Sequence, residues 1–171
     1  MRSIRSLTAF VFVILLLGCG KSRQLTSLLP DAPEGWKTEG SASNNDVSGV
    51  GHSSNRSYVP AGSSAGLGAQ RVTVQILLAE KGTTQKQLQE MAVLKQSDFK
   101  ERKEVNGYPA YESFPLPDND THSLIILPKS GTYVEIVAYK GGAGWEKGEN
   151  QQAAVSAFAK KMDLKKIAAI E

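Results

Sequence analysis

Extended segments joined by tight turns constrain the fold of this chain more than any other feature of its sequence. Apolar side chains alternate from Arg71 to Ala79, which is the period of a β-strand with one buried face. Asn106-Gly107 separates two extended runs and is a strong signal for a β-hairpin. The strands expected on such grounds are 71–79, 101–105, 108–114, 122–127 and 132–139. Because successive hairpins join most of them, the sequence predicts a mainly antiparallel sheet.

Two main helices are expected beside this sheet. Thr84 and Gln87 match a capping box, and helix-forming residues continue to about Gln96. A second helix is expected from about Asn150 to Lys161, followed by a short last turn capped by Asp163. The sequence therefore predicts an α+β domain in which about five to six strands and two main helices form packed layers.

Residues 40–70 differ from the rest of the chain in composition. Of these 31 residues six are Gly and eight are Ser, and few are apolar. Such a segment buries little surface, so we expect it to be flexible over much of its length. Within it we expect only a short strand at 57–59, after an edge strand that begins at 37–39.

The order of these elements resembles the PsbP-like α/β/α sandwich. The resemblance covers Leu29 to Ile170 and rests on four features. They are the Pro33-x-Gly35-Trp36 opening, the strand at 71–79 before a helix, the Val105-Asn106-Gly107-Tyr108 hairpin and the closing helix. That fold is used by accessory proteins of envelopes and lumenal compartments, many of them without catalytic activity. The resemblance implies an accessory role and carries no catalytic residues over to this chain.

The first nineteen residues form a pattern of their own. Arg2 and Arg5 precede the uncharged run 7–17, which is apolar except for Thr8. Eleven residues suit the apolar region of a signal peptide, whereas a membrane span needs about 20. Gly18 supplies the small residue that cleavage requires, and Cys19 follows it.

Leu16-Leu17-Gly18-Cys19 resembles the lipobox of bacterial lipoproteins. The resemblance implies cleavage between Gly18 and Cys19 and a diacylglycerol, with palmitate-type chains, on the Cys19 sulfur. Gly20 is not the Asp that retains such proteins at the inner membrane, which favours the outer membrane, facing the periplasm, in a Gram-negative cell. The predicted organisation is a signal peptide at 1–18, an acylated tether at 19–29 and a single α+β domain at 30–171.

Charge and cysteine content exclude several classes of protein. Removing Arg2 and Arg5 with the signal peptide leaves 18 basic and 17 acidic residues, so nothing in the charge indicates a nucleic-acid partner. Cys19 is the only cysteine, which excludes an internal disulfide and a multi-thiolate metal site.

Ser64 is the one candidate nucleophile suggested by a motif. Residues 62–66 fit the G-x-S-x-G pattern, and His122 follows with Asp118 and Asp120 just before it. That chemistry requires a strand before the serine and a helix after it, and neither is expected here. A Gly/Ser-rich loop is the favoured interpretation, and no catalytic residue is predicted.

Metal and cofactor motifs are incomplete. Asp118-Asn119-Asp120 begins like a calcium loop, but Ser123 and Lys129 occupy the positions of its Gly and closing Glu. His52 and His122 lack partners at ligand spacing. The glycines at 142 and 144 lack the third glycine of a dinucleotide fingerprint. We predict no metal and no cofactor.

Two surface features suggest contacts with partners. Trp145 follows a glycine-rich loop and is the predicted interaction residue, the alternative being that it packs over the sheet edge. Lysines at 160, 161, 165 and 166 either touch anionic headgroups or form a solvated helix face, which is the favoured interpretation. The sequence thus predicts a lipid-anchored, non-enzymatic envelope protein that binds the membrane through Cys19 and an envelope protein through its domain. A small hydrolase or a small-ligand-binding lipoprotein are the alternatives.

Overall fold

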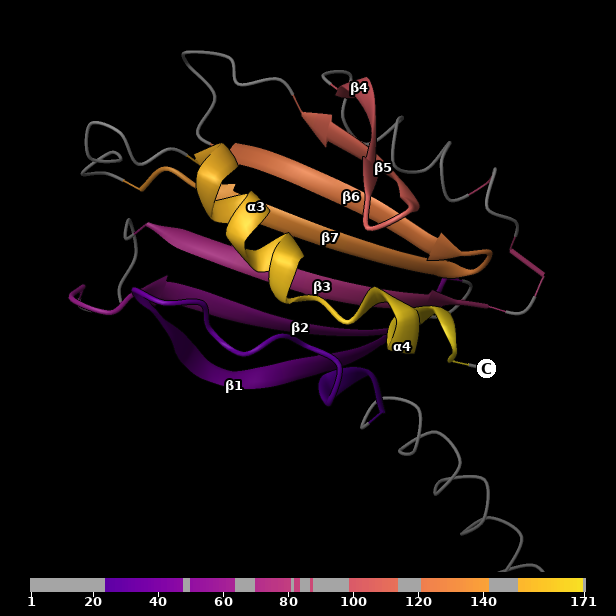
Figure 1. Cartoon of the computed structure of the whole chain (residues 1–171). Helices are drawn as coiled ribbons and strands as arrows, with labels where there is room; N and C mark the ends of the chain where they lie inside the picture. Colours follow the sequence, from indigo (N-terminus) through magenta and orange to yellow (C-terminus); the bar gives the residue numbers. More distant parts are fainter. Residues whose placement is uncertain are drawn as a thin grey trace, which may run out of the picture.

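A seven-stranded antiparallel sheet with helices packed on one face makes up the described part of the chain (Figure 1). The computed structural model describes residues 24–47, 50–63, 70–80, 82–83, 87, 99–113, 121–141 and 151–170. The strands are β1 (Trp36–Val47), β2 (Gly51–Pro60), β3 (Arg71–Ala79), β4 (Phe99–Val105), β5 (Tyr108–Ser113), β6 (Thr121–Lys129) and β7 (Thr132–Tyr139). The helices are α3 (Gln151–Lys161) and α4 (Leu164–Ala168). The mainly antiparallel α+β fold is confirmed.

The strand order is β1-β2-β3-β7-β6-β5-β4, so two meanders meet at the centre of the sheet. The first runs from β1 to β3, and the second starts at the far edge with β4 and returns to pair β7 with β3. The two edge strands, β1 and β4, are rich in polar or charged residues, which discourages pairing with another chain.

The strands predicted from alternation and hairpin signals are confirmed. Val72, Val74 and Ile76 of β3 are fully buried on the face covered by the helices. In β6 every residue from His122 to Pro128 is buried, because this strand is covered on both faces. Asn106 and Gly107 form the β4–β5 turn with φ values of 52° and 83°, the left-handed conformation that such turns require.

The segment 40–70 is more regular than predicted, which raises the strand count above five to six. Most of it belongs to β1 and β2, which pair with each other along their length and connect to β3. Low strand propensity is overridden here because the apolar β3 offers a complete ladder of backbone partners. Small side chains are buried on both faces of β2: Ser54 pairs with Ile76 on the face covered by the helices and is 0% exposed, and Ser53 pairs with Leu77 on the other face and is 1% exposed.

Gly51 is required where β2 begins. Its φ is 137°, and a Cβ at this position would lie 2.1 Å from the carbonyl oxygen of Leu78. Only a residue without a side chain permits β2 to approach β3 this closely.

The main apolar core lies between the sheet and the helices. Phe158 of α3 is fully buried, and its ring meets Tyr58 at 4.6 Å and Trp36 at 5.4 Å between centroids. Asp163 caps α4 by accepting a hydrogen bond from the backbone N–H of Lys166, as predicted. The predicted helix at 84–96 lies outside the described residues except for Gln87, which is helical.

The domain begins earlier in the chain than predicted. Leu25 and Leu29 were expected in the tether, but they are 0% and 5% exposed and belong to the main core. The Tyr58 hydroxyl donates a 2.6 Å hydrogen bond to the carbonyl oxygen of Pro30, and burial raises the pKa of Tyr58 to about 12. Among the described residues, the folded domain therefore includes the segment from Gln24 to Pro30.

Replacing Phe158 tests whether this aromatic contact supports the core. Phe158→Ala should lower the free energy of unfolding by about 3–5 kcal/mol, because it leaves a cavity beneath α3. Phe158→Leu, which keeps most of the apolar volume, should cost markedly less. Urea unfolding of the two variants measures both values, and equal small losses would show that α3 does not depend on this ring.

Candidate functional site

A polar cluster around a buried glutamate and a buried histidine lies under the first turn of α3 and brings together four elements of the fold. Its members are Lys103 of β4, Glu112 of β5, His122 of β6 and Gln152 of α3. Glu112 and His122 are 4% and 1% exposed, and His122 Nε2 lies 3.1 Å from Glu112 Oε1. The Lys103 ammonium pairs with the other carboxylate oxygen. Gln152 Nε2 lies 3.5 Å from Oε1.

These contacts keep Glu112 ionised. The hydrogen bond from His122 and the charge of Lys103 lower the pKa of Glu112 to about 2, against the opposing effect of burial. Since a carboxylate only accepts hydrogen bonds, His122 donates through Nε2–H. Its Nδ1 is buried with no hydrogen-bond partner in the described part of the chain.

A histidine beside a carboxylate is a common pair for proton transfer, but this pair is closed to solvent. His122 is 1% exposed, and Glu112 already uses both oxygens on protein donors. A substrate has no access to either group in this arrangement. The cluster instead holds β4, β5, β6 and α3 together through charge-assisted hydrogen bonds.

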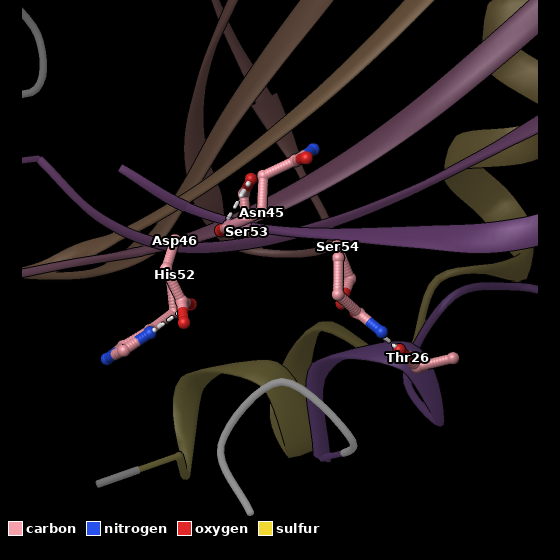
Figure 2. Close-up of polar contacts among 7 residues, drawn as sticks. Thr26, Asn45, Asp46, His52, Ser53 and Ser54 are labelled. Atoms are coloured by element: carbon pink, nitrogen blue, oxygen red, sulfur yellow. Dashed lines mark hydrogen bonds and ion pairs between the residues drawn. The ribbon is translucent and has the colours of Figure 1, made fainter. Parts of the chain in front are cut away.

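The second histidine lies on β2, next to the opposite edge strand of the sheet, where Figure 2 shows polar contacts of β1 and β2 with each other and with Thr26. His52 Nδ1 is 2.6 Å from Asp46 Oδ1, and both side chains are partly open to solvent. Beside them, Thr26 Oγ1 donates to Asn44 Oδ1 at 2.8 Å and lies 3.1 Å from Ser54 Oγ. These contacts attach the N-terminal helical turn to β1 and β2.

An open hollow lies where the β4–β5 turn meets the corner between α3 and α4. It is lined by Asn106, Tyr108 and the segment Lys161–Lys165, and has a volume of about 380 Å³. Met162 and Leu164 are almost fully buried and supply an apolar floor, whereas Lys161 and Lys165 are exposed at its rim. This combination suits a ligand that carries both an apolar part and a negative charge.

Most of the residues predicted from sequence lie outside the described residues. This applies to Gly18, Cys19, Ser64, Trp145, the Asp118–Asp120 segment and the glycines at 142 and 144. His52 and His122 are described and lie on different strands at opposite parts of the sheet. The four lysines are described and lie at the end of α3 and in α4.

Sequence reasoning missed the carboxylate at the centre of the buried cluster. The predicted Asn106-Gly107 hairpin contained the signal, because its register places Lys103 diagonally across from Glu112. The β5–β6 register pairs Glu112 with Leu124 and likewise leaves His122 diagonal to it. Diagonal neighbours on one face of a sheet are within reach of long side chains.

The chain matches no protein-family model, no curated protein and no solved structure at a significant level. The lipobox and the resemblance to the PsbP-like sandwich therefore stay predictions. Within the described ranges, no three His, Cys, Asp or Glu side chains gather as metal ligands. No helix among those residues is long and apolar enough to cross a bilayer.

Acid titration tests the role of Glu112. Its pKa is lower in the folded chain than in the unfolded one, so its stabilisation is complete above about pH 4.5 and is lost as pH falls toward 2. The free energy of unfolding should drop across this window by on the order of 3 kcal/mol more in the parent than in Glu112→Gln.

Urea unfolding between pH 7 and pH 2.5 measures the difference. Glu104→Gln, which changes an exposed glutamate on β4, is the matched control and should retain the parental slope. The same acid sensitivity in Glu112→Gln and in the parent would contradict the assignment.

Proposed function

We propose that this chain is a lipid-anchored protein of the bacterial cell envelope whose single α+β domain acts as a non-enzymatic binding module. The anchor is a diacylglycerol on Cys19, added after the 1–18 segment is recognised as a lipoprotein signal peptide. In a Gram-negative cell the domain faces the periplasm from the outer membrane. Several acyl chains make such attachment stable, where a single chain gives only marginal binding.

The observation that carries this proposal is the position of the first core residue in the described part of the chain. Leu25 is completely buried and lies only six residues after Cys19. The six residues from Cys19 to Gln24 span at most about 18 Å from the first Cα to the last when fully extended. A lipid on Cys19 therefore holds the folded domain against the bilayer.

A binding role is favoured over catalysis by the two sites that the structure describes. The histidine–carboxylate pair with the geometry for proton transfer is sealed from solvent. The open hollow at the α3–α4 corner has an apolar floor and a charged rim, as binding sites do. The same hollow supports small-ligand binding as the second candidate function.

Metabolic labelling tests the anchor directly. In a Gram-negative host, the parent chain should incorporate palmitate and Cys19→Ser should incorporate none, because the acceptor sulfur is absent. Gly20→Asp is the matched control: it retains the acceptor cysteine, so it should be labelled and should move to the inner-membrane fraction. Equal labelling of the parent and Cys19→Ser would overturn the proposed function.

A further inference from the structure

Four lysines gather at the corner formed by the end of α3 and by α4. We call Lys160, Lys161, Lys165 and Lys166 the basic corner. All four side chains are exposed. The segment 160–167 contains one acidic residue, Asp163, so its net charge is +3. The whole chain also has a formal charge of +3, so the remaining residues are neutral on balance. The basic corner is therefore a local concentration of positive charge.

The single acidic residue of the corner is already paired. Asp163 accepts a hydrogen bond from the backbone N–H of Lys166 and forms a 2.8 Å ion pair with its ammonium group. These bonds lower the pKa of Asp163. Lys161 and Lys165 have no ion pair within the described part of the chain. Their ammonium groups, at the rim of the hollow, are the ones free to meet an external anion.

The strand register places the basic corner at the same end of the sheet as the N-terminal turn. Thr26 contacts Ser54, and Ser54 belongs to a row of paired residues that crosses the sheet to Ala110 on β5. Tyr108, which lines the hollow, lies two residues beyond that row on the same face. The turn and the hollow thus lie on the helix-covered face, toward one end.

Both figures agree with this placement. In Figure 1 the indigo turn at the start of the described chain lies next to α4 and near the C-terminus. In Figure 2 the turn that carries Thr26 lies beside the yellow C-terminal ribbon. Leu25 belongs to the same apolar cluster as Met162 and Leu164, which supply the floor of the hollow.

We propose that the basic corner docks on the anionic phospholipid headgroups of the leaflet that holds the Cys19 anchor. Lys161 and Lys165 then bind a headgroup phosphate at the mouth of the hollow. The inference rests on the proposed lipid anchor, because the short connection from Cys19 to Gln24 brings this end of the domain to the bilayer surface. Docking gives the domain a fixed orientation on the membrane.

The positive charge of the basic corner is complementary to the negative charge of phospholipid headgroups, and this is why we assign headgroups as its partner. Lysines at the end of a helix also interact with its dipole, which accounts for a basic residue at the last turn of α3. The same effect favours Lys165 and Lys166, which lie in the last turn of α4. It does not account for the position of Lys161 and Lys165 around an apolar hollow, where neither has an ion pair within the described part of the chain. Basic clusters next to a membrane anchor are attracted to anionic headgroups over about one Debye length.

A fluorophore on the exposed residue Ala169 reports docking, since Ala169 follows α4 and lies one helical turn after Lys165. The full acylated chain carrying Ala169→Cys has one free thiol, because acylation occupies Cys19. It is reconstituted in vesicles of phosphatidylcholine alone, or with roughly one third phosphatidylglycerol. Quenching by acrylamide then measures the exposure of the label.

We expect the quenching constant to be about twofold lower on the anionic vesicles and to recover in about 1 M salt, where charges are screened. Lys161→Glu combined with Lys165→Glu should give equal quenching on both vesicles. The matched control, Lys37→Glu with Lys140→Glu, makes the same charge change at the opposite end of the sheet and should behave as the parent. Circular dichroism of each variant checks that it is folded.

The outcomes separate the two proposals. Protein that carries no acyl chain would overturn the proposed function and the docking with it. Acylated protein whose label is quenched equally on neutral and anionic vesicles would overturn the docking alone. A lower constant that persists in the Lys161 and Lys165 variant would show that another surface faces the membrane.

Discussion

The packing of Phe158 against Tyr58 is the contact on which the arrangement of this domain depends. This contact joins α3, near the end of the chain, to β2, in the first half of the chain. The ring of Trp36 on β1 also packs against Phe158. The Tyr58 hydroxyl also donates a hydrogen bond to the carbonyl oxygen of Pro30, which fixes the N-terminal segment to this aromatic cluster. Both ends of the described chain are thereby brought to one face of the sheet.

This shared face would link the proposed membrane attachment to the proposed binding of headgroups. The N-terminal turn is fixed on β1 and β2 by Thr26, while α4 carries its lysines beside the same core. The proposed lipid on Cys19 would hold this face near the bilayer, since the connecting chain spans at most about 18 Å. The buried Glu112–His122 pair acts at the other end of α3, where it holds β4, β5 and β6 in register.

Regular strands were predictable where local sequence and tertiary packing agree. Alternation located β3, and Asn106-Gly107 located the β4–β5 hairpin, because each signal acts over a few residues. β1 and β2 were predicted only in part, at 37–39 and 57–59, because Ser, Asn and Gly have low strand propensity and form the rest of these strands through pairing with their neighbours. Leu25 was missed as a core residue because the helical spacing of Leu25, Leu28 and Leu29 extends over a single turn, which is too short to indicate a helix. The basic corner was visible in the sequence, but its hollow depends on a turn more than 50 residues away.

The central claim is that the folded domain lies directly on the bilayer, because Leu25 is a core residue. Neutron reflectometry of the acylated chain on a supported bilayer that contains phosphatidylglycerol tests it most directly. The account predicts a protein layer that begins at the headgroups, with no solvent layer thicker than the reach of the tether, about 18 Å. A thicker solvent layer between headgroups and protein would contradict it, since residues after Gln24 would then have to leave the core.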